Sequence, residues 1–120
     1  MDIGETLYIA DRDAWRAWLA DHHAQQQEVW LLFFKKASGK PSIAYDEAVE
    51  EAICFGWIDS QIRSMDQARF ARRFTPRREG SAWSESNRVR ALKMLGAGRM
   101  TKAGLASLPE EVLRFWPGDA

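Results

Sequence analysis

The sequence predicts an α+β domain in which helices pack against a small, mainly antiparallel sheet that contains a β-hairpin. Three patterns support this fold class: helical spacing of apolar residues over 12–23, an unbroken apolar run at Val29–Phe34, and two alternating segments, 57–64 and 70–75, joined by a short polar turn. The elements follow the order β-α-β-α-β-β-α-α. A length of 120 residues is typical of one domain, so residues 1–120 are expected to fold together.

The first half of the chain alternates strands and helices. Thr6–Ala10 predicts a short strand, and Asp11 is expected to cap a helix, because its carboxylate accepts hydrogen bonds from the free N–H groups of a first turn. The apolar run within residues 28–36 predicts a central strand covered on both faces. A second helix with an acidic first turn is expected to end at Gly56.

The second half begins with the hairpin and continues with helices. A turn around Met65–Arg69 is expected to join the two hairpin strands. Ser84 and Thr101 are expected to cap the two helices that follow, and Pro109–Trp116 to add a last helical turn. Residues 76–81, rich in proline, glycine and arginine, are predicted to form the loop between the hairpin and these helices.

The register of the hairpin decides which side chains share a face. With an even number of turn residues, Asp59 would lie beside Phe74. With an odd number, Phe74 would instead join Ile58 and Ile62 on an apolar face. We expect the odd register, through a five-residue connection or a bulge, because it buries the aromatic side chains together.

Composition argues against a membrane or secreted protein. The longest apolar run, Val29–Phe34, has six residues, far fewer than the roughly 20 that span a bilayer. Residues 1–5 carry two acids and no basic residue, unlike a secretory signal. A single cysteine, Cys54, excludes an intramolecular disulfide and a multi-cysteine metal site, and its apolar setting predicts a buried thiol. We therefore expect a cytoplasmic protein with no membrane partner, no metal and no cofactor.

Zero net charge conceals a strong segregation of charge. Residues 1–62 contain five basic and eleven acidic residues, whereas residues 63–93 contain nine basic and three acidic ones. Such segregation indicates either a nucleic-acid or anionic partner for the basic segment, or two segments that pair with each other in the fold.

One region carries the residue types that binding chemistry requires. In the odd register, the polar side chains of the hairpin share one sheet face, and a basic loop then leads to the start of a helix. A helix start with arginines and hydroxyls nearby is suited to an anion, and two tryptophans would form its apolar wall. A purely structural role, as ion pair, helix cap and packing residue, stays open for the same set. The candidate residues are Trp57, Asp59, Gln61, Arg63, Arg73, Thr75, Arg77, Arg78, Ser81, Trp83, Ser84 and Asn87.

Three uncommon motifs occur in order along the chain: CFGWID (Cys54–Asp59), RFTPRREGSAWSESN (Arg73–Asn87) and GRMTKAGL (Gly98–Leu105). With them the chain resembles the bacterial YdeI/OmpD-associated family, often labelled bacteriocin-protection proteins, over roughly residues 7–108. Compared with longer members, it lacks a helical C-terminal extension. The resemblance implies a protein-interaction module in stress or bacteriocin protection, and it assigns no catalytic residue.

The sequence therefore leaves several functions open. The leading expectation is a small anionic ligand bound on the polar face of residues 57–87. The alternatives are nucleic-acid binding through residues 63–93, and a protein-interaction module with an exposed apolar patch around Phe115 and Trp116. No catalytic set is recognisable, so enzymatic activity and the oligomeric state stay open.

Overall fold

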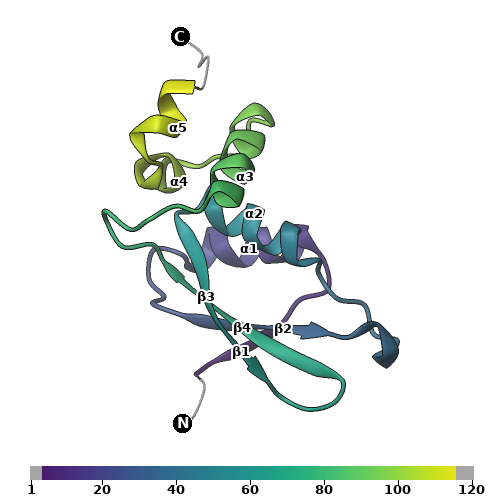
Figure 1. The fold of residues 1–120 in the computed structure, drawn as a ribbon. Helices are drawn as coiled ribbons and strands as arrows, with labels where there is room; N and C mark the ends of the chain where they lie inside the picture. The colour runs from purple at the N-terminus through teal and green to yellow at the C-terminus, as the bar shows by residue number, and fades with distance from the viewer. Residues whose placement is uncertain (1–3, 116–120) are drawn as a thin grey trace.

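The computed structural model describes residues 4–115, which form a four-stranded sheet with helices packed on one side (Figure 1). The strand order is β1-β2-β4-β3, with β1 and β2 parallel and the other neighbours antiparallel. The predicted α+β fold with a mainly antiparallel sheet is confirmed. The strands are β1 (Thr6–Tyr8), β2 (Val29–Phe34), β3 (Trp57–Ser64) and β4 (Arg69–Pro76).

The helices form the second layer and extend beyond it. α1 and α2 lie next to the sheet, and α3, α4 and α5 follow towards the C-terminal end of the described chain (Figure 1). None of the helices between residues 4 and 115 is both long enough and apolar enough to cross a membrane. The helices are α1 (Arg12–His22), α2 (Tyr45–Cys54), α3 (Glu85–Gly96), α4 (Lys102–Ser107) and α5 (Glu110–Phe115), with a short 3-10 helix, η1 (Lys36–Ser38), in the predicted loop before α2.

The predicted helix boundaries have the expected local causes. The side chains of Asp11, Ser84 and Thr101 each accept a hydrogen bond from the backbone N–H three residues ahead, at 2.9, 3.1 and 3.2 Å. These bonds satisfy N–H groups that a helix cannot pair internally. Gly56 follows α2 with φ of 76°, a conformation that glycine adopts without strain.

Strand β2 is central and buried on both faces, as its apolar run predicts. Leu31 lies in the core between sheet and helices together with Trp15, Leu19 and other apolar side chains. Trp30 and Leu32 point to the opposite face, where they pack with Ala71 and are only 4% and 7% exposed. The sheet therefore has a small apolar cluster on the side away from the helices as well.

The hairpin turns at Met65–Ala68, with five residues between the paired positions Ser64 and Phe70, and it also contains a β-bulge. Beyond the bulge, Ile62 pairs with Arg72, which is the odd register. Before it, Asp59 pairs with Phe74, which is the even register. The prediction that Asp59 shares a face with Arg73 is therefore wrong, because the extra residue of the bulge reverses which side chains face the helices.

Helix α4 docks on the end of α2 through a close backbone contact. The backbone N–H and the hydroxyl of Thr101 both donate to the carbonyl oxygen of Cys54, at 3.0 and 2.5 Å. Gly104 packs directly over the same carbonyl: a Cβ placed on it would lie 2.2 Å from that oxygen. Only glycine fits here without displacing one of the helices.

Gly104→Ala is therefore expected to destabilise the domain by about 1–3 kcal/mol, the usual effect of overpacking a tight contact. Urea unfolding followed by circular dichroism measures the difference. Ala106→Ser is the matched control, because it adds one atom at an exposed position of the same helix and is expected to change stability by less than about 0.5 kcal/mol. Equal midpoints for wild type and Gly104→Ala would contradict the close packing described here.

Candidate functional site

An open cleft of about 760 Å³ lies at the end of the hairpin where β4 leads into the loop before α3. One wall is the sheet face that turns away from the core, and the other is formed by the loop and the first turn of α3. Its size is within the range of small-molecule sites. The cleft is lined by Gln27, Ile58, Ser60, Arg73, Thr75, Pro76, Arg77, Arg78, Ser81, Ala82, Ser84 and Asn87.

The cleft brings together seven of the twelve candidate residues, and each of the seven is either positively charged or neutral. Its described lining residues include three arginines, four hydroxyls and two amides, and none of them carries a carboxylate. Arginine presents a planar fork of donors that matches carboxylate and phosphate oxygens. The seven are Arg73, Thr75, Arg77, Arg78, Ser81, Ser84 and Asn87.

Arg77 is held rigidly at the entrance to the loop. Its guanidinium lies 3.8 Å from the centre of the Trp83 ring and donates to the Ser81 hydroxyl at 2.9 Å and to the Ala82 carbonyl at 3.0 Å. Burial lowers its pKa, and the charge of Asp59 offsets this effect only in part. The Trp83 ring and the two hydrogen bonds hold the Arg77 guanidinium in position. Arg77 forms no ion pair with any described residue, so its positive charge is only partly compensated.

Arg78 and Arg73 differ from Arg77 in their surroundings. Arg78 is exposed, and its side chain forms no hydrogen bond or ion pair with any other residue between positions 4 and 115. Arg73 donates from Nε to the carboxylate of Glu28, a residue outside the lining of the cleft. The full positive charge therefore lies at the loop end of the cleft, around Arg77 and Arg78.

The residues at the start of α3 are engaged in the helix itself. Ser84 caps the backbone of Asn87, and the Asn87 side-chain oxygen accepts a hydrogen bond from Arg90 at 2.9 Å. Both residues line the cleft while filling these structural roles. The Ser84 hydroxyl also shares a hydrogen bond of 3.3 Å with the Ser86 hydroxyl, so the side-chain N–H groups of Asn87 are the donors left for a ligand.

Five candidate residues lie outside the cleft. Trp57 is 1% exposed, packs in the core and donates weakly to the His23 carbonyl at 3.4 Å, so the prediction that it forms a pocket wall is wrong. Asp59 faces the helices, where it accepts a hydrogen bond from the Tyr45 hydroxyl at 3.1 Å and lies 3.5 Å from the guanidinium of Arg72. The others are Gln61 at the exposed bulge, Arg63 further along β3, and Trp83, whose ring packs against the guanidinium of Arg77.

A second concavity, of about 850 Å³, lies on the other side of the same loop, against α4 and α5. Residues 77, 78, 81 and 82 line both spaces, so this loop segment separates them. The second space also contains the carboxylates of Glu79 and Glu111, and Glu111 pairs with Arg88 at 3.1 Å. Its two glutamates offset two of its three arginines, Arg77, Arg78 and Arg88, which makes it a weaker site for an anion than the cleft without carboxylates.

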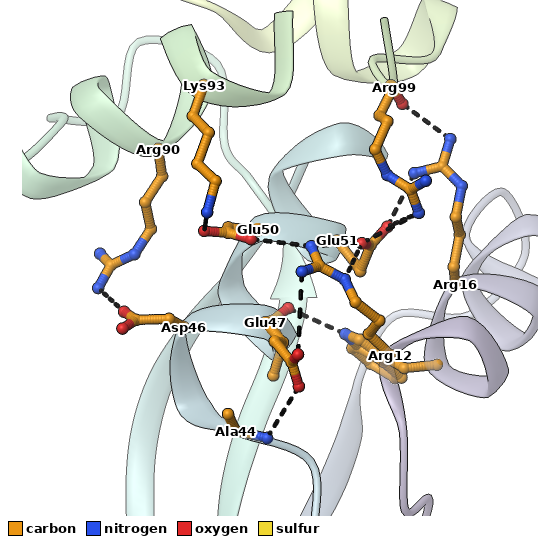
Figure 2. Close-up of polar contacts among 12 residues, drawn as sticks. Arg12, Arg16, Ala44, Asp46, Glu47, Glu50, Glu51, Arg90, Lys93 and Arg99 are labelled. Atoms are coloured by element: carbon orange, nitrogen blue, oxygen red, sulfur yellow. Dashed lines mark hydrogen bonds and ion pairs between the residues drawn. The ribbon is translucent and has the colours of Figure 1, made fainter. Parts of the chain in front are cut away.

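A buried cluster of charges joins α1, α2 and α3, and no part of it was among the predicted site residues (Figure 2). The Glu51 carboxylate is fully buried and accepts from Arg12 and Arg16 of α1, at 2.7 and 2.8 Å, and from Arg99 at 3.2 Å. Glu50 bridges Arg12 and Lys93 at 2.8 Å each. Two adjacent acids on the buried face of a helix were the sequence signal that could have revealed it.

The charge cluster is structural rather than a binding site. Burial alone would raise the pKa of Glu51, but hydrogen bonds from Arg16 and Arg12 and the charge of Arg99 outweigh it, so the pKa lies below its ordinary value. Every carboxylate oxygen of Glu51 already has an arginine partner. Among residues 4–115 no group of His, Cys, Asp and Glu side chains is arranged to hold a metal ion.

The segregated charges of the sequence pair with one another across the fold. Basic residues of segment 63–93 form ion pairs with acids of segment 1–62 at four places: Arg72 with Asp59, Arg73 with Glu28, Arg90 with Asp46, and Lys93 with Glu50. The hypothesis of pairing within the fold is confirmed. Less of the basic segment is left for a nucleic-acid partner, with Arg78 the clearest free cation of the cleft.

Comparison with known proteins matches residues 7–107 to the family described as Domain of unknown function (DUF8412). The chain belongs to this family. No curated protein and no solved structure matches the chain. The family description names no ligand or activity, and the resemblance to YdeI/OmpD-associated proteins stays a prediction.

Replacing Glu51 with glutamine keeps its size and removes its charge, so Glu51→Gln is expected to lower the free energy of unfolding by about 3 kcal/mol near neutral pH. Because the folded pKa is lowered, this contribution is present above the unfolded value of about 4.3 and is lost as pH falls through the folded value. Urea unfolding at pH 7 and pH 3 should therefore show a difference that shrinks in acid. Glu110→Gln, in an exposed pair, is the control, and a difference independent of pH would refute the ion-pair interpretation.

Cys54 is expected to be unreactive in the folded protein. It is completely buried, and burial raises the pKa of its thiol to about 11, with a hydrogen bond donated by Arg16 opposing the rise. The thiolate, which is the reactive form, is then roughly a thousandth of the population at pH 8. A thiol reagent such as DTNB should modify the native protein at the rate of unfolding and the urea-unfolded protein at once. Rapid modification of the native protein would show that the thiol is accessible.

Proposed function

We propose that this domain binds a small anionic ligand in the cleft between the end of the hairpin and the start of α3. The observation that carries the proposal is the lining of that cleft, which combines three arginines with hydroxyl and amide groups and contains no carboxylate among its described residues. Such a lining complements a carboxylate or phosphate group. A cytoplasmic location, where small anionic metabolites are abundant, is part of this proposal.

The surroundings of the two loop arginines, Arg77 and Arg78, support the proposed anion site. Arg77 is half-buried, fixed by the Trp83 ring and by two hydrogen bonds, and forms no ion pair among residues 4–115. Arg78 is exposed at the same rim. An anion placed between them would compensate a partly desolvated charge without any rearrangement of Arg77, and preorganised groups bind with a smaller loss of entropy.

Nucleic-acid binding is the weaker candidate. Six of the nine cations in segment 63–93 form ion pairs with acids of the described residues, and the overall charge of the chain is zero. A patch around Phe115 and Trp116 would favour a protein partner, but Trp116 lies outside the described residues, and of Phe115 only the backbone is described. Membership of the YdeI/OmpD-associated family, and a role in bacteriocin protection, therefore stay proposals without a structural feature to support them.

The proposal is tested by thermal-shift measurements with phosphate, sugar phosphates, nucleotides, di- and tricarboxylates and short oligonucleotides. A ligand that binds the native state raises the melting temperature of the wild type. Arg78→Ala is expected to weaken binding of that ligand roughly 10- to 100-fold, because a hydrogen bond to a charged group contributes about 1.5–3 kcal/mol.

Arg69→Ala is the matched control, since it removes the same charge at the opposite end of β4, where Arg69 pairs with Asp66. It is expected to leave the ligand-induced shift unchanged. Arg77→Ala is less informative alone, because it also removes the contacts that fix the loop. A wild-type protein that no compound stabilises, or one for which Arg78→Ala and Arg69→Ala have equal effects, would overturn the proposal.

A further inference from the structure

The anionic-ligand cleft continues into a smaller polar concavity of about 480 Å³. Gln27 and Arg73 line both spaces, so the two form one connected surface along β4. The smaller space carries the carboxylates of Glu5 and Glu28 and the side chains of Gln25 and Gln26. The connected surface is therefore acidic at one end and basic at the other.

The charges of this surface are arranged in a fixed order. At the acidic end, Glu28 accepts from Arg73, and Glu5 accepts a hydrogen bond from Gln26 at 3.2 Å. The basic end is formed by Arg77 and Arg78. Arg73 and Glu28 neutralise each other, so Arg73 does not extend the basic end towards the middle of the surface, and the net negative charge of the acidic end is that of Glu5.

The middle of the surface is neutral and can form hydrogen bonds. Ile58, Ser60 and Thr75 line this part of the cleft between Arg73 and the loop. A ligand with two anionic ends would place its second charge beside Glu28 and Glu5, where it would be repelled. A ligand with a cation at one end and an anion at the other has a complementary partner at each end.

We propose that the ligand is a short, extended peptide whose free amino terminus lies beside Glu5 and Glu28 and whose terminal carboxylate lies between Arg77 and Arg78. The inference rests on the proposed anion site, because the carboxylate is the anion that site would hold. Arg73 and Arg77 are four residues apart on an extended segment, a span of roughly 13 Å at about 3.3 Å per residue. An extended peptide of about four residues has the same length.

The test compares calorimetric binding of four ligands: tetra-alanine with free ends, its N-acetyl form, its C-terminal amide, and glutarate as a simple dianion. Free tetra-alanine is expected to bind at least tenfold more tightly than either blocked peptide, because each block removes one terminal charge. Dialanine, too short to reach both ends, is expected to bind at least tenfold more weakly than tetra-alanine.

The variant Glu28→Gln tests whether the acidic end of the surface causes the preference for a free amino terminus. The variant is expected to bind free and N-acetylated tetra-alanine equally, while the amide stays weaker because Arg77 and Arg78 are unchanged. It also releases Arg73, so glutarate should bind the variant more tightly than the wild type. Glu110→Gln, the same change on α5, is expected to keep the wild-type order of affinities.

The outcomes separate this inference from the proposal it rests on. If glutarate or another simple anion binds through Arg78 and tetra-alanine binds no better than its blocked forms, the peptide assignment is wrong and the anion site stands. If the acetylated peptide equals the free one in the wild type, the amino-terminal contact beside Glu5 and Glu28 is refuted. If neither peptides nor simple anions bind, both proposals fail.

Discussion

The buried carboxylate of Glu51 is the interaction on which the arrangement of the helices depends. It lies on α2, and its arginine partners come from α1 and from the segment after α3, so one group joins three parts of the helical layer (Figure 2). A buried charge is tolerated only when it is fully paired. Because each arginine must point to the same two oxygens, the cluster restricts the angles at which these helices pack.

That restriction reaches the proposed ligand cleft through α2 and α3. Lys93 and Arg90 of α3 pair with Glu50 and Asp46 of α2, which sets the direction of α3. The first turn of α3 contributes Ser84 and Asn87 to the cleft. Ion pairs between α2 and α3, in which Glu50 is buried while Asp46 and Lys93 are exposed, thus help to position one wall of the proposed cleft.

Local chemistry determines which features could be predicted from sequence. Asp11, Ser84 and Thr101 cap their helices because a cap needs only a side chain and the next three residues. The central position of β2 followed from its apolar run. The loop arginines and serines were correctly predicted to lie together, because they are close along the chain.

The sequence predictions failed where the position of a residue depends on contacts with residues far away in the chain. The bulge near Ser60 reverses the faces of the first part of β3, and no residue type in the strand marks its position. Asp59 and Trp57 consequently face the core side, away from Arg73. The partners of Glu51 lie 35 to 48 residues away in sequence. Its ion pairs therefore depend on how the helices pack, which the spacing of apolar residues does not predict.

The loop segment shared by the two concavities has a further consequence. Arg77, Arg78, Ser81 and Ala82 form a partition with an open space on each side, and Arg77 fastens it to Trp83. A shift of this partition that widens one space narrows the other. A molecule in one space that displaced this partition would lower the affinity of the other space for its own occupant, and by the same factor in both directions.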